Sequence, residues 1–216
     1  MTPGGVVFDL DGVLVDSERV CYELALRVAR EAGADLPESA YAQFVGAAPS
    51  EFWAWMRDHF ALKETTEQLL DNKQGELLEW YRTPVWMPGA MRLVESLTDA
   101  GVPCAVASSS PRSFIEAALS AGSLEARIRV VVSVDDPDLV RPKPNPDVYL
   151  QACRKLRIEP ARCVAIEDSP TGALAAQSAG LRVIVAPNEW TRGESFPSAV
   201  ERVEGLEALI ARAPNI

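Results

Sequence analysis

Apolar residues along this chain gather in short continuous runs that are separated by amphipathic stretches. Five runs are typical of buried strands, at residues 6–9, 102–108, 128–134, 162–168 and 181–186. Their apolar residues are continuous rather than alternating, as expected when helices cover both faces of a parallel sheet. The pattern therefore predicts an α/β fold with a doubly wound parallel sheet.

Helical spacing of apolar residues fills the segments between these runs. The predicted helices cover residues 17–33, 90–100, 147–156, 172–179 and 204–213, and one more starts at about Pro111. Residues 38–82 are helical in character throughout and contain no convincing strand. We therefore expect a core formed by residues 1–15 and 86–216, with an all-helical insert at residues 16–85.

Composition narrows the class of protein. The chain has 216 residues, of which 48% are hydrophobic, and a formal net charge of −10 at pH 7. The acidic balance argues against binding to nucleic acid or to an anionic membrane surface. No apolar run approaches the ~20 residues of a membrane-spanning helix, and the N-terminus has no signal-peptide pattern. We expect a cytoplasmic protein that is a monomer.

Cysteine and histidine usage excludes several site chemistries. The cysteines form no C-x-x-C pair, and four of them are few for a disulfide scaffold. Cys104 and Cys163 lie in apolar runs, where we expect small buried thiols. His59 is the only histidine. Ser–His–Asp catalysis and histidine-rich metal sites are therefore nearly excluded.

Two aspartates, two residues apart, follow the first predicted strand. Asp9 ends the strand, and Asp11 can present a second carboxyl from the same side of the stretch DLDG. A calcium loop is excluded, because Val20 stands where its bidentate glutamate would be. One carboxylate can attack phosphorus while the other exchanges protons with the leaving oxygen and with water. A turn without a catalytic role is the alternative.

A second acidic pair closes another predicted strand. Glu167 and Asp168 end the run at 162–168 and precede the segment SPTG. Such a pair can simply cap the next helix. With Asp9 at the same edge of the sheet, a site for Mg²⁺ is favoured, because this ion takes a few carboxylates and keeps several waters. The ion would offset the repulsion between a carboxylate and a phosphate.

A lysine between prolines is the candidate fixed positive charge. Lys143 sits in the segment RPKPNPD, where three prolines stiffen the backbone. It can serve as a fixed charge for phosphoryl oxygens and for Asp9, although a lone lysine is usually solvated. We interpret Arg141 as a surface residue.

A serine run follows the predicted strand at 102–108 and opens a helix. A hydroxyl combined with the N–H groups of a helix N-terminus makes an anion site, whereas simple helix capping is the alternative. Ser108 is the best candidate for a phosphate contact, and Ser109 is the next. Asp9, Ser108 and Asp168 all stand at strand ends, which is where ligands collect in open parallel sheets.

These motifs, in this order, closely resemble the haloacid dehalogenase superfamily of phosphotransferases. The resemblance covers nearly the whole chain, and the insert at 16–85 is similar to the α-helical cap of that family. It implies a Rossmann-like core with Asp9 as nucleophile and Asp11 as acid/base. Magnesium would bind Asp9, the Asp11 carbonyl and Asp168, with Glu167 as a further ligand or a supporting group.

The resemblance also assigns the phosphate contacts and a branch of the family. Ser108 and Lys143 would hold the phosphoryl group. The stretches FDLDGVLVDSE, KPNPDVY and IEDSPTGALAAQSAG are similar to the branch that contains β-phosphoglucomutase and small sugar-phosphate phosphatases. The mutase of that branch has a histidine in its first cap helix, where this chain has Cys21. It also has a cap-loop arginine soon after a glycine that resembles Gly46, where this chain has Pro49.

Both departures favour net hydrolysis over transfer. Haloacid dehalogenases themselves lack the second aspartate and need no metal, so Asp11 argues against dehalogenation. We therefore predict a Mg²⁺-dependent phosphatase that acts on a small phosphorylated metabolite, a sugar or sugar-acid phosphate, through an aspartyl-phosphate. A phosphomutase is the alternative enzyme. A binding or regulatory protein without turnover is the alternative of another class.

The loop at 44–53 is expected to close over the site and to contact the leaving group. Gly46 is the predicted substrate contact there, and Glu51 and Trp53 are candidates for selectivity. Trp53 and Trp55 are two residues apart and cannot share one helix face. One of them can face the cleft while the other packs in the cap; the alternative is that both pack in the cap or lie on its surface.

Overall fold

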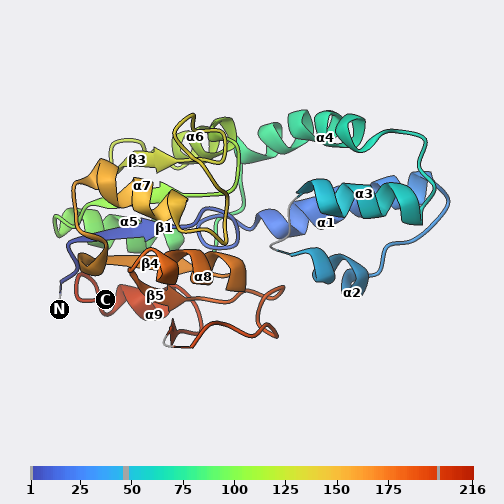
Figure 1. Cartoon of the computed structure of the whole chain (residues 1–216). Helices are drawn as coiled ribbons and strands as arrows, with labels where there is room; N and C mark the ends of the chain where they lie inside the picture. Colours follow the sequence, from blue (N-terminus) through green and yellow to red (C-terminus); the bar gives the residue numbers. More distant parts are fainter. Residues whose placement is uncertain (1, 46–48, 199) are drawn as a thin grey trace.

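The computed structural model describes residues 2–45, 49–198 and 200–216, and it has two parts (Figure 1). One part is a six-stranded sheet in the order β3-β2-β1-β4-β5-β6, in which every pair of neighbours is parallel. The strands are β1 (Gly5–Phe8), β2 (Cys104–Ala107), β3 (Ile128–Val132), β4 (Cys163–Glu167), β5 (Arg182–Val185) and β6 (Glu201–Arg202). The order is that of a Rossmann fold, so the predicted doubly wound sheet is confirmed.

Helices cover both faces of this sheet. They are α5 (Ala90–Asp99), α6 (Arg112–Ala121), α7 (Asp147–Leu156), α8 (Pro170–Ser178) and α9 (Glu207–Ile210). The buried residues form two clusters, one containing α5, α6 and α9 and the other α7 and α8. Along β1, Val6 and Phe8 belong to the first cluster and Val7 to the second. This two-sided burial explains why the strands are continuous apolar runs.

Two features at the C-terminal end differ from the sequence-based expectation. Strand β6 was not predicted, because Glu201–Arg202 has two polar residues and no apolar pattern. Helix α9 covers only Glu207–Ile210, which is shorter than the predicted helix at 204–213. Gly205 is a poor helix residue, and Pro214 disfavours helical geometry in the residue before it. Both residues therefore shorten the helix.

The second part consists of helices inserted between β1 and α5. They are α1 (Ser17–Glu31), α2 (Glu38–Tyr41), a 3₁₀ turn (Ala42–Phe44), α3 (Pro49–His59) and α4 (Thr66–Tyr81). These helices bury their own apolar cluster, which includes Ala25, Leu36, Phe52 and Met56. No strand forms in the described part of this insert, as predicted. None of the helices described here combines the length and apolarity needed to cross a membrane.

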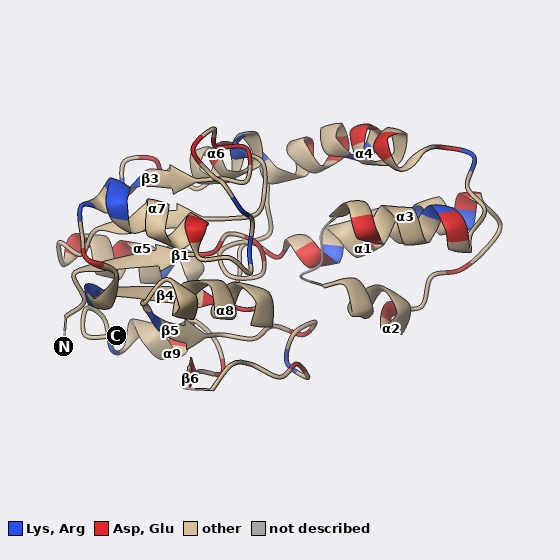
Figure 2. Ribbon diagram, viewed as in Figure 1, with Lys and Arg blue, Asp and Glu red and all other residues tan. Residues whose placement is uncertain are grey.

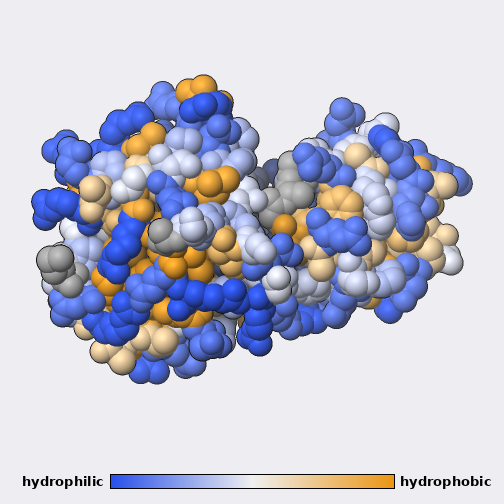
Figure 3. Space-filling view, turned by 60° about the horizontal axis from the view of Figure 1, so that its bottom comes forward, coloured by the Kyte–Doolittle hydropathy of each residue, from blue (hydrophilic) through white to orange (hydrophobic). Residues whose placement is uncertain are grey.

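The chain enters and leaves this helical part through adjacent segments. The Asp16 N–H donates to the Val85 carbonyl over 2.9 Å, and the Met87 N–H donates to the Leu14 carbonyl over 2.9 Å. The space-filling view shows two lobes with a waist between them (Figure 3). The predicted boundaries of the insert at 16–85 fall at these two hydrogen bonds, and we propose that residues 16–85 form a separate cap domain.

Candidate active site

The site lies where the strands end and the helical lobe begins. Asp9 directly follows β1, Ser108 follows β2, and β4 ends on Glu167 and is followed by Asp168. Because β2, β1 and β4 are parallel neighbours, their carboxyl ends bring these residues to one edge of the sheet. Figure 2 shows acidic residues of the segment between β1 and α1 at the junction of the two lobes. The sequence-based placement of these residues at one edge is therefore confirmed.

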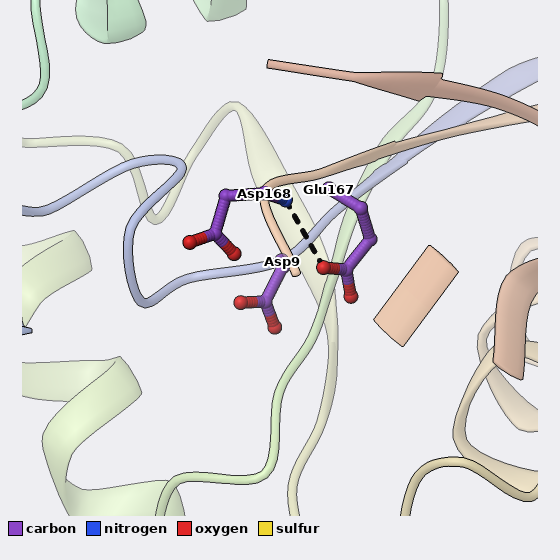
Figure 4. Close-up of side chains that lie close together, drawn as sticks. All are labelled: Asp9, Glu167 and Asp168. Carbon is purple, nitrogen blue, oxygen red and sulfur yellow. Dashed lines mark hydrogen bonds between the residues drawn. The ribbon is translucent and has the colours of Figure 1, made fainter. Parts of the chain in front are cut away.

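Three carboxylates meet at this edge. Asp9, Glu167 and Asp168 are buried, and each offers one oxygen within 4.8 Å of the others. Figure 4 shows the three side chains directed toward a common region. Burial raises the pKa of Asp9 to about 8, against the opposing charge of Lys143. Burial and the charge of Glu167 likewise raise the pKa of Asp168 well above its usual range.

Lys143 supplies positive charge inside this cluster. Its Nζ lies 2.7 Å from Asp9 Oδ1 and 2.7 Å from Glu167 Oε1. Burial lowers the pKa of Lys143, but the charges of Asp9 and Glu167 outweigh it and hold the pKa well above its usual value. One ammonium faces three buried carboxyl groups, so ionisation of all three would leave excess negative charge. Oxygen ligands with excess negative charge fit a small divalent cation such as Mg²⁺.

Glu167 uses both of its oxygens within the protein. Oε1 accepts from Lys143 and from the Tyr149 hydroxyl at 2.5 Å, and Oε2 accepts from the Asp168 N–H at 3.1 Å. A Cβ at Gly172 would lie 1.8 Å from Glu167 Oε1. Glycine at position 172 therefore makes room for the carboxylate, and these contacts suit a residue that positions Lys143.

Asn188 is a residue of the site that the sequence analysis missed. Its Nδ2 donates to Asp168 Oδ2 over 2.8 Å, and its Oδ1 accepts from the Trp190 N–H over 2.9 Å. It lies just beyond the carboxyl end of β5, so the rule that located the other residues would have found it. Gly12 packs directly against these side chains, because a Cβ at position 12 would lie 2.2 Å from Asp168 Oδ2. The φ of Gly12 is +74°, which also favours glycine.

Asp11 is held by hydroxyl groups. Its carboxylate accepts from Ser17 at 2.7 Å, from Ser110 at 2.6 Å, from Ser108 at 3.2 Å and from Tyr81. Ser17 begins α1 and Tyr81 ends α4, so two of the donors belong to the two connections of the helical lobe. The orientation of Asp11 is therefore tied to the position of that lobe.

The serine run presents two hydroxyl groups to Asp11, and a phosphate contact of Ser108 or Ser109 stays a prediction. Ser108 is buried, and its Oγ also accepts from the Ser110 N–H over 2.9 Å. Ser109 is exposed, and none of the hydrogen bonds described joins its side chain to Asp9 or Asp11. Ser110, rather than Ser109, provides the second hydroxyl beside Asp11. Alternation of side chains in the segment after β2 explains the difference, because residues 108 and 110 point to the same side.

Other predicted residues lie away from the carboxylates. Arg141 is exposed and pairs with Asp147 at 3.0 Å, as expected of a surface residue. His59 is exposed on α3 and stacks on Trp55, with 4.6 Å between ring centroids. Gly46, the predicted substrate contact, lies outside the described residues.

The cap tryptophans have different surroundings. Trp53 is buried and lines a cavity of about 330 Å³ at the junction of the lobes. Trp55 packs inside the cap against Phe44, with 5.0 Å between ring centroids. Glu51 is exposed on α3 and does not line this cavity, so we no longer expect it to affect selectivity. Cys21 and Pro49 both line the cavity.

A loop of the core also touches the cap. The ring centroid of Trp190 lies 5.5 Å from that of Tyr22 and 5.3 Å from that of Tyr41. Arg19 of α1 pairs with the neighbouring Glu189. Asn188 therefore joins the side chain of Asp168 to the segment that contacts the cap.

Comparison with known proteins identifies the family. Residues 4–180 match the family model described as haloacid dehalogenase-like hydrolase. The chain belongs to this family. It is 33% identical over 180 residues to validoxylamine A 7'-phosphate phosphatase of Streptomyces hygroscopicus subsp. limoneus, and this match covers 81% of both chains. The predicted membership is confirmed, and the protein is a phosphoric monoester hydrolase.

Solved structures agree with this assignment. The crystal structure of CbbY from Rhodobacter sphaeroides in complex with phosphate matches with a TM-score of 0.81 and 25% identity, over 96% of both chains. The β-phosphoglucomutase of Clostridium difficile shares the fold, with a TM-score of 0.76 at 18% identity over 96% of this chain and 93% of that one. The predicted Rossmann-like core with a cap is therefore confirmed for this haloacid dehalogenase-like hydrolase.

Proposed function

We propose that this hydrolase is a Mg²⁺-dependent phosphatase that cleaves phosphate esters of small metabolites through an aspartyl-phosphate on Asp9. One observation carries the proposal: Lys143 contacts both Asp9 and Glu167 at 2.7 Å, beside the buried carboxylate of Asp168. This arrangement fixes one nucleophilic oxygen at the edge of the sheet and leaves excess negative charge for a cation. We propose that it works in the cytoplasm.

The residues divide the reaction between them. Asp9 attacks phosphorus, the bond from phosphorus to the leaving oxygen breaks, and Asp11 donates a proton to that oxygen. Water then attacks the phosphoryl group on Asp9 while Asp11 takes its proton, which releases phosphate. Lys143 and Ser108 hold the phosphoryl oxygens. These steps return every residue to its starting state.

The acidic cluster fits a magnesium ion as a resident cofactor. Asp9 and Asp168 would hold it together with the backbone carbonyl of Asp11, and Glu167 would support the site through Lys143. When bound, the ion supplies positive charge that offsets repulsion between Asp9 and the phosphate. That charge also opposes the effect of burial on the pKa of Asp9, which must be ionised to attack.

Hydrolysis is favoured over the mutase alternative by the cavity next to Asp11. The positions at which the resemblance expects a histidine and an arginine are Cys21 and Pro49, and both line that cavity. The only histidine, His59, is exposed on α3 instead. Cys21 and Pro49 therefore replace the histidine and the arginine that would hold a bisphosphate intermediate in this cavity.

Turnover of p-nitrophenyl phosphate tests the proposal. We expect activity with Mg²⁺, loss in EDTA and recovery when Mg²⁺ is restored. Reaction in ¹⁸O-labelled water should place the label in released phosphate, because water accepts the phosphoryl group. Absence of turnover would favour a binding protein, and a requirement for a sugar bisphosphate would favour a mutase.

A further inference from the structure

The cavity that Trp53 lines begins beside the residues that contact Asp11. Ser17 and Ser110 both donate to Asp11, and the next residues in the sequence, Glu18 and Pro111, line the cavity. It measures about 330 Å³, at the lower end of the range of ~300–1,000 Å³ for ligand sites. An ester oxygen at Asp11 would thus place the rest of the leaving group in this cavity.

Apolar side chains dominate the walls of the cavity. Those from the cap and the core include Leu24, Phe44, Phe52, Trp53, Leu77 and Phe114. Phe52, Trp53 and Phe114 are buried, and Phe52 also packs edge-on against Tyr41 with 5.2 Å between ring centroids. A wall of rings and branched chains binds an apolar ring well, because it removes apolar surface from water on both sides.

Few hydrogen-bonding groups of the described residues face the same cavity. Lys73 already contacts Glu76 at 3.2 Å, and the Tyr41 hydroxyl donates to Glu18 Oε2 at 2.8 Å. Gln74 and the Cys21 thiol are the other polar side chains of the lining. A free sugar brings four or more hydroxyl groups, and each one buried without a partner weakens binding by about tenfold.

Glu18 supplies the one carboxyl group among the described residues that line the cavity. Tyr41 makes the one hydrogen bond that the described residues give it, so its second oxygen can accept a ligand. Burial raises the pKa of Glu18 to about 7, against the hydrogen bond from Tyr41. Near neutral pH the carboxyl can therefore both accept and donate hydrogen bonds, which suits a neutral hydroxyl group better than a fixed cation.

We propose that the leaving group of the substrate is a compact, largely apolar ring that carries a single hydroxyl group, and that Glu18 binds this hydroxyl. The proposal rests on the phosphatase function proposed above and narrows its substrate class. It departs from the sequence-based expectation of a sugar or sugar-acid phosphate. The reason is that the composition of the cavity depends on how the cap helices pack on the core, which local sequence patterns do not reveal.

A panel of esters of primary alcohols tests the class of leaving group. Benzyl phosphate and glucose 6-phosphate have leaving oxygens of similar basicity. Acetyl phosphate has a small leaving group, so its turnover measures the core residues without the cap cavity. We expect kcat/KM for benzyl phosphate to exceed that for glucose 6-phosphate by about tenfold or more. Equal values, or a preference for glucose 6-phosphate, would overturn the inference and leave the phosphatase proposal standing. Lack of turnover of both esters and of acetyl phosphate with Mg²⁺ would overturn both proposals.

Variants then locate the selectivity. Trp53→Ala should lower the ratio of benzyl phosphate to glucose 6-phosphate by about tenfold, whereas Trp53→Leu should keep part of it. Glu51→Ala is the matched control, because Glu51 is exposed on the same helix and does not line the cavity. Retained turnover of acetyl phosphate shows that each variant is folded. An unchanged ratio in Trp53→Ala would contradict the inference.

The role of Glu18 needs a substrate pair that differs by one hydroxyl group. The wild-type enzyme should prefer 4-(hydroxymethyl)benzyl phosphate to benzyl phosphate by about tenfold. Glu18→Leu should abolish this preference while still hydrolysing benzyl phosphate, and Glu18→Gln should keep part of it. If Glu18→Leu retains the full preference, Glu18 is not the group that binds the hydroxyl.

Discussion

The two walls of the active site are built on different principles. On the core side, Asp9, Glu167 and Asp168 are buried at neighbouring strand ends, and Lys143 joins Asp9 to Glu167 through charge-assisted hydrogen bonds. On the cap side, aromatic and aliphatic side chains from several helices line a cavity in which Glu18 is the carboxyl. The core wall holds individual atoms in position for one reaction, whereas the cap wall forms an apolar surface of defined shape around the leaving group. Chemistry and selectivity can therefore be altered separately.

The largest effect is expected at the nucleophile. Asp9→Asn removes the attacking oxygen, so turnover of every substrate should fall below detection. The free energy of unfolding should not fall, because burial already raises the pKa of Asp9 to about 8 and a neutral amide avoids the cost of a buried charge. Substrate panels and thermal unfolding check both statements. Residual turnover that differs between substrates would contradict the claim that the core wall acts on all substrates alike.

Lys143 should affect both chemistry and stability. Lys143→Met leaves Asp9 and Glu167 without their shared cation, so we expect a loss of about 3–5 kcal/mol in the free energy of unfolding. Turnover should fall by at least about 10²-fold for all substrates. Adding Glu167→Gln should restore part of the stability, measured by denaturant unfolding, but none of the activity. Recovery of activity in the double variant would refute the role of Lys143 at the phosphoryl group.

Asp11→Asn should slow the reaction by about 10²–10⁴-fold, the usual contribution of general acid–base catalysis. The first step should suffer less for substrates with good leaving groups, because these depart without a proton. Single-turnover measurements with p-nitrophenyl phosphate and benzyl phosphate compare the two cases. Equal losses in that step would contradict the role of Asp11 as the acid.

The smallest effect concerns the cap wall. The pKa of Glu18 is raised from its ordinary value of 4.5 to about 7, so between these pH values the folded protein holds more protons than the unfolded chain. The free energy of unfolding should therefore fall as pH rises through this window. The titratable groups near Glu18 include Tyr41, Cys21, Asp11, Asp16 and Asp168, and Lys73 lines the same cavity.

Glu18→Gln should remove this part of the pH dependence. Denaturant unfolding of both proteins at several pH values gives the difference, which contains the contribution of Glu18 together with its effect on the pKa of Asp168. If the free energies of unfolding of the two proteins change with pH in parallel, folding does not raise the pKa of Glu18. That result would contradict the description of the cap wall as an apolar surface.

The two walls also differ in what the sequence reveals. Asp9, Ser108 and Asp168 stand at the ends of apolar runs, and parallel neighbours bring such ends together, so the core wall follows from local patterns. Asn188 obeys the same rule, because it follows the end of β5. The serine run by itself does not indicate that Ser110 is a residue whose hydroxyl contacts Asp11. The cap wall depends on how helices distant in the sequence pack, and single residues such as Glu18 carry no local signal of it.

The most direct test of the account is to trap the phosphoryl group on Asp9. The Asp11→Asn enzyme can still be phosphorylated by acetyl phosphate, which has a good leaving group, but it lacks the base that activates water. Intact-protein and peptide mass spectrometry should find the mass of one phosphoryl group on Asp9 when Mg²⁺ is present, and none in EDTA or in Asp9→Asn. A phosphoryl group on another residue, or its absence while acetyl phosphate is hydrolysed, would contradict the mechanism.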